Sequence, residues 1–215
     1  MTRIAIADDH ALVRRGLAEL LDETDDLRVV AQADDGGDLL RALRDAREHG
    51  RAADVVVMDM NMPPPSGLDL VKSLRAEFPE TPVLVLSAHP EDQYAVRVVR
   101  AGAMGYLTKE AAEADLVAAI RRLASGKRFL TQALAESLLD ALDTDPDAEP
   151  HAALSDREFQ VLRMLASGHT VGGIAERLAL SVKTVSTYRT RLLQKMGMTN
   201  NAEITRYALE HKLVE

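Results

Sequence analysis

Polar side chains stand at the ends of several short apolar runs, where they could act together on a phosphate group. Asp8 and Asp9 follow the first run, Asp59 ends the third, Ser87 ends the fourth, and Lys109 lies just beyond the fifth. Three neighbouring carboxylates would raise one another's pKa values unless a cation neutralises them, and Mg²⁺ is the hard divalent ion that best suits oxygen ligands and a substrate phosphate. We therefore expect a Mg²⁺ site in which Asp59 is the nucleophile that forms an acyl phosphate. The Lys109 ammonium and the Ser87 hydroxyl would contact the phosphoryl oxygens.

The apolar runs that carry these residues predict the strands of a parallel sheet. They are 4–7 residues long, rich in Val, Ile and Leu, and cover residues 3–8, 27–33, 54–59, 82–87 and 104–107. Amphipathic segments lie between them, and the first places Val13, Leu17, Leu20 and Leu21 on one face. Five such units predict an α/β fold with a doubly wound five-stranded parallel sheet. Ligands of such sheets bind beyond the carboxyl ends of the strands, which is where the polar residues stand.

Composition excludes several classes of site. The chain has 215 residues and no cysteine, which excludes disulfides, cysteine-bound zinc and thiol nucleophiles. No apolar stretch approaches the roughly 20 residues of a membrane span, and the N-terminal run is too short for a signal peptide. We therefore expect a cytoplasmic protein with no membrane contact. The net charge of −8, taken alone, argues against a polyanionic partner such as DNA.

The charge is unevenly distributed along the chain. Residues 1–139 hold 17 basic and 23 acidic side chains, residues 140–150 hold five acids and no base, and residues 151–215 hold 9 basic and 6 acidic side chains. The acidic stretch 143–150 carries two prolines and little apolar bulk, which is typical of a linker. We predict a first domain over 1–127, a linker helix (130–142) and acidic linker within 128–150, and a second domain over 151–215.

The second domain is predicted to be entirely helical. Its helices are expected at 155–166, 171–178, 182–196 and 201–211. Helix starts are indicated by capping boxes of Ser155 with Glu158 and of Asn200 with Glu203, and by the N-caps Thr170 and Ser181. Gly168 and Gly197 follow the first and third helices, as C-terminal caps do.

The second and third of these helices, separated by a short break, have the spacing of a helix-turn-helix. No acidic residue occurs between Lys183 and Ala202, so the third helix presents only positive charge. Such a helix with small hydroxyl side chains suits insertion into the major groove of double-stranded DNA. The basic charges by themselves favour an ordinary core helix with a solvated face. The spacing and the paired N-caps favour the DNA-binding interpretation.

The first domain resembles the receiver domain of bacterial two-component response regulators, which has a flavodoxin-like fold. The resemblance is carried by Asp8-Asp9, by the segment 56–63 around Asp59 with Ser66-Gly67, by 86–88, and by 105–109. It implies that a histidine kinase phosphorylates Asp59.

The receiver resemblance also implies roles for the neighbouring residues. Asp9, Asp59 and the backbone carbonyl of Asn61 would hold Mg²⁺, and Asp8 would act mostly through a coordinated water. Ser87 and Tyr106 would be the switch pair that reorients when the phosphate arrives.

The second domain resembles the LuxR-type DNA-binding domain of the NarL/FixJ subfamily. Leu154–Glu158, Thr184-Val185 and Lys195-Met196-Gly197 carry the likeness, and the Tyr188-Arg189 pair is similar to the GacA/UvrY branch. The resemblance implies that base edges or the nearby backbone are contacted by Lys183, Ser186, Thr187 and Thr190. Phosphate contacts or packing are implied for Thr184, Arg189, Arg191 and Lys195.

The resulting prediction is a transcriptional regulator that is no enzyme and that dimerises when phosphorylated. One alternative is a DNA-binding regulator whose receiver-like domain does not respond to phosphate. Another is a phosphatase of the haloacid-dehalogenase type, but those enzymes favour an Asp where this chain has Asn61. No phosphate-binding glycine loop follows any strand, so nucleotide binding is not supported. The six histidines lack ligand spacing, which argues against a histidine-bound metal.

Overall fold

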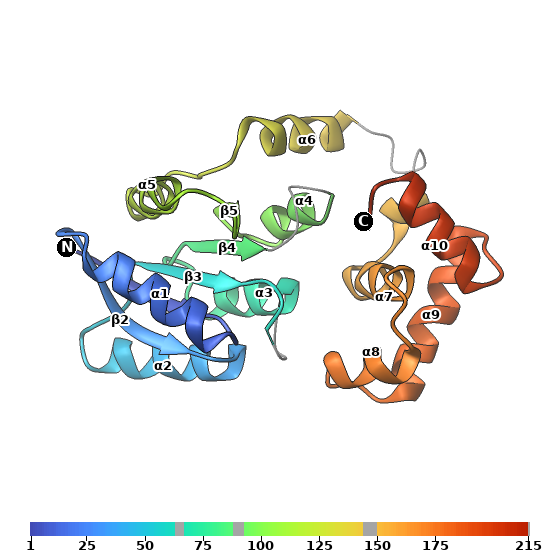
Figure 1. Ribbon diagram of the computed structural model, residues 1–215, viewed down its shortest axis with the longest axis horizontal. Coiled ribbons are helices and arrows are strands. Elements are labelled where there is room, and N and C mark those ends of the chain that lie inside the picture. Colours follow the sequence, from blue (N-terminus) through green and yellow to red (C-terminus); the bar gives the residue numbers. More distant parts are fainter. Residues whose placement is uncertain (63–66, 88–92, 144–149, 215) are drawn as a thin grey trace. The chain divides into compact units, whose positions relative to one another are not determined.

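The computed structural model describes residues 1–62, 67–87, 93–143 and 150–214. These residues form two compact units, one almost entirely within 1–135 and the other almost entirely within 136–215. Figure 1 shows a sheet with its helices in the first unit and helices alone in the second. Pro63–Ser66, Ala88 and nearly all of the expected acidic linker, Thr144–Glu149, lie outside the described residues. No helix among the described residues is long and apolar enough to cross a membrane.

The first unit is built on a parallel sheet whose strand order is β2-β1-β3-β4-β5. The strands are β1 (Thr2–Ala7), β2 (Leu27–Ala33), β3 (Val55–Asp59), β4 (Val83–Ser87) and β5 (Gly105–Thr108). The helices between and after them are α1 (Ala11–Asp22), α2 (Gly36–Glu48), α3 (Gly67–Glu77), α4 (Gln93–Arg100) and α5 (Glu113–Ala124). From β1 the chain adds β2 on one side and then β3, β4 and β5 on the other, so the direction in which strands are added reverses at β1. The doubly wound fold expected from the apolar runs is therefore confirmed.

Both faces of the central strands are buried. Every residue of β3 and β4 is buried, as the uninterrupted apolar runs predict. On one face α1 and α5 pack against alternate strand residues, with Leu21 and Ile120 fully buried among them. The strand side chains that alternate with these point to the opposite face of the sheet. Of the residues expected on the apolar face of α1, Leu17, Leu20 and Leu21 pack into the core on the α1 side of the sheet, whereas Val13 is 38% exposed.

Backbone hydrogen bonds continue beyond the strand ends and set the positions of the polar residues. The N–H of Met60 donates to the carbonyl of Leu86 at 2.9 Å, and the N–H of Lys109 donates to the carbonyl of Ser87 at 2.7 Å. The ladder pairs Ser87 with Thr108. Asp59, Ser87 and Lys109 are therefore held at one edge of the sheet by the backbone itself.

The remaining elements are helices. They are α6 (Gln132–Asp143), a short 3-10 helix η1 (Pro150–Ala153), α7 (Asp156–Ala166), α8 (Val171–Arg177), α9 (Val182–Met196) and α10 (Asn201–Glu210). The helix predicted at 130–142 is thus confirmed within two residues, as are the four helices of the second unit. Their buried residues form a separate core that includes Phe159, Leu162, Val185, Leu192 and Ile204.

The predicted helix caps are present with one difference. Ser155 and Glu158 form a capping box, and the Thr170 and Ser181 side chains each accept a hydrogen bond from the backbone at N3. Asn200 caps α10 by accepting from the Glu203 N–H. The Glu203 carboxylate accepts from the N–H of Thr199, not of Asn200, at 2.7 Å, so the second capping box is only half formed. Gly197 ends α9 in the left-handed region at φ 65°.

Candidate functional site

Three strand ends bring acidic and basic side chains into direct contact. Lys109, just beyond β5, places its Nζ 2.8 Å from Asp8 Oδ2 and 3.1 Å from Asp59 Oδ2. Asp8 follows β1 and is 1% exposed, and Asp59 ends β3 and is 2% exposed. The convergence that the sequence predicted is therefore observed, and the two buried carboxylates share one ammonium group.

Burial and neighbouring charges have opposing effects on the pKa values of Asp59 and Lys109. Burial raises the pKa of the Asp59 carboxyl above its usual value, although the nearby Lys109 ammonium opposes the shift. Burial tends to lower the pKa of Lys109, but the hydrogen bond to Asp8 and the charge of Asp59 outweigh it and raise that pKa. Asp59 Oδ1 is buried and has no hydrogen-bond partner. One lysine does not satisfy the negative charge of the site, so a further cation would be favourable there.

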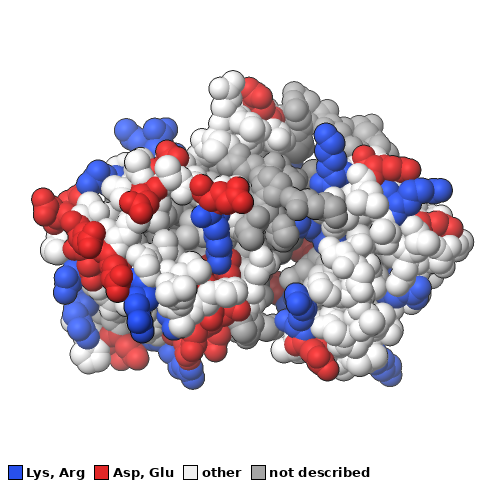
Figure 2. Space-filling view, in the orientation of Figure 1, with Lys and Arg blue, Asp and Glu red and all other residues white. Residues whose placement is uncertain are grey.

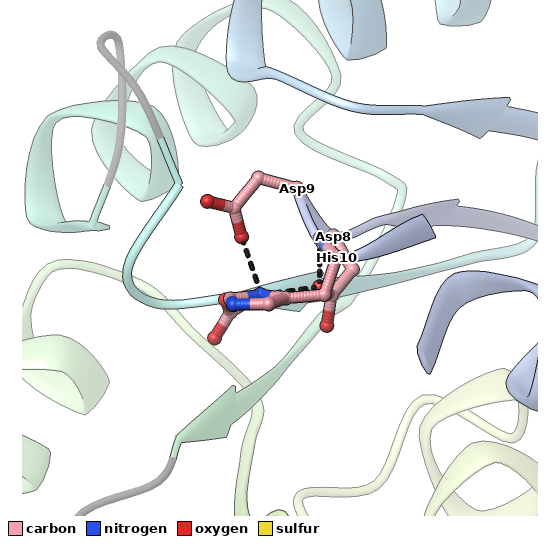
Figure 3. Close-up of side chains that lie close together, drawn as sticks. Asp8, Asp9 and His10 are labelled. Atoms are coloured by element: carbon pink, nitrogen blue, oxygen red, sulfur yellow. Dashed lines mark hydrogen bonds and ion pairs between the residues drawn. The ribbon is translucent and has the colours of Figure 1, made fainter. Parts of the chain in front are cut away.

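The surrounding ligands fit a metal ion. Ligand atoms of Asp8, Asp9, His10 and Asp59 all lie within 4.8 Å of one another. Figure 3 shows Asp8, Asp9 and His10 grouped at the end of β1. Carboxylate oxygens are the preferred ligands of hard divalent cations, and the unpartnered Asp59 Oδ1 supplies a free one. Asn61, whose carbonyl was an expected ligand, lies in the turn two residues after Asp59.

The sequence reasoning missed two residues beside this cluster. His10 Nδ1 lies 2.8 Å from Asp9 Oδ1 and 3.3 Å from Asp8 Oδ1, so a histidine does belong to the group that could hold a metal. Arg14, one turn into α1, donates from its guanidinium to the backbone carbonyl of Asp8. The position of His10 directly after the two aspartates was the available signal. A search for histidines at metal-ligand spacing along the chain does not detect it.

The two expected switch residues are both buried. Ser87 is 1% exposed at the end of β4, and Tyr106 is fully buried in β5. Tyr106 is paired with Val85 in the ladder, two residues before the level of Ser87. The tyrosine ring is therefore enclosed on the same pair of strands that carries the serine.

Magnesium should stabilise the first unit through these carboxylates. At a Mg²⁺ concentration of about 100 times the Kd, the free energy of unfolding should rise by about 2.7 kcal/mol. Asp9→Asn should remove most of that gain, because Asp9 is the most accessible carboxylate of the group, at 30% side-chain exposure. Calorimetry of the full chain with and without Mg²⁺ measures this change.

Asp69→Asn is the matched control, since Asp69 lies in the first turn of α3 and belongs to neither of the two acidic groups that could hold a metal ion among the described residues. The Mg²⁺ gain should survive in that variant. An equal loss in both variants would mean that Mg²⁺ acts through general screening of acidic charge.

The second unit presents α9 with one buried and one exposed face. Val185, Leu192 and Met196 are buried, and Ile174 and Ala175 of the contacting helix α8 belong to the same core. The exposed face carries Lys183, Ser186, Thr187, Thr190 and Arg191. Figure 2 shows Lys and Arg on this unit with fewer acidic groups than on the first unit. A basic, mostly polar helix face of this kind suits a nucleic-acid backbone and groove.

Three of the expected DNA-contacting residues pair with other side chains of the protein. Arg189 Nε donates to Asn201 Oδ1 at 2.7 Å, and Thr184 Oγ1 lies 2.8 Å from Ser181 Oγ. Lys195 Nζ lies 2.7 Å from Oε2 of Glu158, a carboxylate that is 3% exposed. Burial opposes ionisation of Glu158, but the hydrogen bonds from Lys195 and Ser155 hold its pKa below the usual value. These contacts favour the packing role for Lys195 and Arg189.

Comparison with known families decides what these two units are. The family described as "Response regulator receiver domain" matches residues 4–121, more than half of the chain, and "Bacterial regulatory proteins, luxR family" matches residues 152–208. The chain belongs to the response regulators. Its first unit is the receiver and its second is a LuxR-type DNA-binding domain, so the resemblances stated from the sequence are confirmed.

Relatives and solved structures match the receiver and the LuxR-type domain together. "Response regulator GacA" of Pseudomonas aeruginosa is 37% identical over 100% of this chain and 99% of its own length, and "Response regulator UvrY" of Escherichia coli K12 is 35% identical over 99% and 96%. RcsB of Salmonella enterica serovar Typhimurium, solved on promoter DNA with the phosphomimetic BeF3−, covers 96% of this chain and 97% of its own, with 27% identity and a TM-score of 0.67. Another RcsB structure, of two dimers bound to two parallel DNAs, has 27% identity, a TM-score of 0.59 and coverage of 97% and 98%.

Proposed function

We propose that a histidine kinase phosphorylates Asp59 and that the acyl phosphate switches DNA binding by α9. The observation that carries the proposal is the Asp59 carboxylate itself. It is buried at the carboxyl edge of the sheet, one oxygen is paired with Lys109, and the other has no partner and lies beside side chains that could hold a metal ion. A carboxylate of this kind is a competent nucleophile once a cation balances the charge.

The transfer uses the side chains of this chain in distinct roles. The Asp59 carboxylate attacks phosphorus, the phosphorus–nitrogen bond to the kinase histidine breaks, and the imidazole leaves as the acyl phosphate forms. Lys109, 3.1 Å from Asp59, neutralises the incoming phosphoryl oxygens, and the Ser87 hydroxyl donates a hydrogen bond to one of them. Asp9, Asp59 and the Asn61 carbonyl would hold Mg²⁺, with Asp8 acting through a coordinated water. Bound Mg²⁺ would supply electrostatic stabilisation of the transferring phosphoryl group.

The output is a change in the C-terminal domain. Tyr106 is already fully buried, so the switch is a repacking of this ring as Ser87 moves toward the phosphate, which alters the surface formed by α4 and β5. We assign the receiver to 1–127, the linker to 128–150 and the DNA-binding domain to 151–215. The altered receiver surface favours a homodimer on a two-fold related DNA site, as RcsB binds DNA in dimers. The protein is a transcriptional regulator, not an enzyme, and acts in the cytoplasm where the kinase histidine and the DNA are both accessible.

Incubation with Mg²⁺ and acetyl phosphate followed by intact mass measurement tests the proposal. One stable adduct of about 80 Da and tighter binding to a sequence-selected duplex are expected. Absence of an adduct with unchanged DNA binding would favour a regulator that does not respond to phosphate. Rapid continuous hydrolysis of acetyl phosphate would favour a phosphatase, which Asn61 in place of the usual Asp already disfavours.

The cations of α9 should differ in their effect on the salt dependence of DNA binding. Lys183→Ala and Arg191→Ala remove exposed charges, so each should weaken binding to every duplex and reduce the slope of log K against log salt by about 1. Lys195→Met should leave that slope unchanged, because its ammonium is held by Glu158. Fluorescence anisotropy over a salt series measures the slopes. A slope reduced by Lys195→Met as much as by Lys183→Ala would contradict the packing role.

A further inference from the structure

His10 lies between the end of β1 and the helix that follows it. It stands at the N-cap position of α1, but its side chain makes no capping hydrogen bond to the helix. The imidazole, which is 65% exposed, is directed instead toward the carboxylates of Asp8 and Asp9, as Figure 3 shows. The side chain is therefore positioned by the carboxylates and not by the start of the helix.

The ring nitrogen of His10 has the spacing of one metal ligand from the next. Nδ1 lies 2.8 Å from Asp9 Oδ1 and 3.3 Å from Asp8 Oδ1. Two ligand atoms bonded to the same ion at about 2.1 Å lie roughly 3 Å apart when they are adjacent. Asp59 completes the group, since all four residues place a ligand atom within 4.8 Å of the others. The four side chains can therefore surround a single ion.

A second observation, independent of this spacing, points to a cation. Asp59 is 2% exposed, and its Oδ1 has no hydrogen-bond partner. Lys109 pairs with the other oxygen of this carboxylate, Oδ2. A buried carboxylate oxygen without a partner costs free energy, which a bound ion would recover.

The ligand atoms of this group differ from those that Mg²⁺ prefers. Mg²⁺ takes oxygen ligands, keeps several waters and is usually bound through one or two carboxylates. Imidazole nitrogen suits Zn²⁺ and other late first-row ions, whose affinity for a mixed nitrogen and oxygen site follows the Irving–Williams order. The carboxylates of Asp9 and Asp59 can serve both kinds of ion, whereas the imidazole of His10 favours the transition metals.

We propose that His10 is a metal ligand that raises the affinity of this site for Zn²⁺ and related transition ions relative to Mg²⁺. The proposal rests on the proposed function, in which the same carboxylates hold Mg²⁺. A neutral imidazole with its proton on Nε2 presents the Nδ1 lone pair to the ion, and Asp9 and Asp59 each supply an oxygen. The ion beside the phosphoacceptor then depends on the relative concentrations of Mg²⁺ and the transition metal.

Titration with the two ions tests the proposal. The full chain is freed of metal with a chelator, and calorimetric titrations with Zn²⁺ and with Mg²⁺ give the ratio of the two dissociation constants. His10→Gln should lower the preference for Zn²⁺ by about 10–100-fold, the range found when even an indirect partner of a bound metal is lost. No capping bond is lost in this variant, because the His10 side chain makes none.

His49→Gln is the matched control. His49 also stands at a helix end, where it is exposed and its Nδ1 lies 2.7 Å from the backbone carbonyl of Asp45, and it is outside the group of Asp8, Asp9, His10 and Asp59. This variant should keep the wild-type preference for Zn²⁺. An equal loss in both variants would mean that Zn²⁺ binds to exposed histidines in general, which overturns the proposal.

Nitrogen-15 NMR of the histidine rings gives a readout that a purely structural role would not change. Zn²⁺ should shift the Nδ1 resonance of one histidine, and that resonance should be missing from the spectrum of His10→Gln. Saturating Mg²⁺ should shift it far less, because Mg²⁺ is held through oxygen atoms.

The outcomes separate this inference from the proposed function. If His10→Gln keeps the wild-type preference for Zn²⁺, or if Zn²⁺ leaves the His10 resonance unmoved, the role of His10 as a ligand is refuted. Formation of the Asp59 adduct with Mg²⁺ alone would still stand, because it does not use the imidazole. If neither ion binds the wild type, this inference and the proposed Mg²⁺-dependent phosphorylation are both contradicted.

Discussion

Asp59→Asn protein should gain no mass on incubation with Mg²⁺ and acetyl phosphate, whereas the wild type gains one phosphoryl group. The amide cannot act as the nucleophile, and the other carboxylates of the site are differently placed. Both Asp8 oxygens are engaged, one by Lys109 and one by the N–H of His10, and Asp9 is 30% exposed at its side chain. The phosphodonor should raise DNA affinity of the wild type by a factor on the order of 5 to 150, the usual range of coupling between two sites. In Asp59→Asn that factor should be 1.

Intact mass and anisotropy with a selected duplex measure the two effects on the same samples. Asp69→Asn is a suitable control, because Asp69 lies in the first turn of α3 and outside the cluster of Asp8, Asp9 and Asp59. It should behave as the wild type. An adduct that persists in Asp59→Asn, or a DNA response to acetyl phosphate without any adduct, would mean that another residue carries the switch.

Much of the receiver follows from local sequence patterns. The apolar runs predict β1 to β5 within one or two residues, because strands buried on both faces must be apolar throughout. Parallel strands then deliver their carboxyl ends to one edge, which is why Asp59 and Lys109 meet although they are 50 residues apart in the chain. No long-range information beyond the sheet itself was needed for this part of the site.

The sequence leaves open the roles of side chains whose partners lie on other helices. Lys195 looks like a DNA-contacting cation when α9 is considered alone, and only the packing of α7 beside α9 shows that it neutralises the buried Glu158. Arg189 is similarly turned toward Asn201 at the start of α10. Periodicity predicts which face of a helix is buried, but it does not predict which charged groups at the border of that face will pair.

The uneven distribution of charge explains why the net charge of −8, taken alone, wrongly argued against DNA as a partner. Part of the acidity belongs to the carboxylates beside Asp59, where Lys109 opposes it. Part belongs to the segment 140–150, and the DNA-binding domain has an excess of basic residues. A total charge averages over domains that meet different partners.

Lys109→Met should be the most destabilising single change at the site. It leaves Asp8 and Asp59, both at least 98% buried, without the ammonium that now lies 2.8 and 3.1 Å from them. Loss of one partner from a buried charge pair costs about 3–5 kcal/mol. Mg²⁺ should restore part of the stability at neutral pH, because it supplies the missing positive charge. Leu192→Ala in the DNA-binding domain should be equally destabilising but insensitive to Mg²⁺.

The pH dependence of Lys109→Met gives the sharper measurement. The pKa of Asp59 is already raised by burial in the wild type, and Lys109 opposes that rise, so the variant should show a higher pKa still. Between the unfolded-state pKa and the raised folded-state pKa, the folded state binds a proton that the unfolded state has released, so stability falls as pH rises through this window and recovers as pH falls through the folded-state pKa toward the unfolded-state pKa. Calorimetry without Mg²⁺ from neutral to mildly acidic pH should therefore show the deficit of Lys109→Met shrinking. A deficit that is constant with pH and unaffected by Mg²⁺ would mean that Lys109 contributes packing alone and does not balance the charge of the phosphoacceptor.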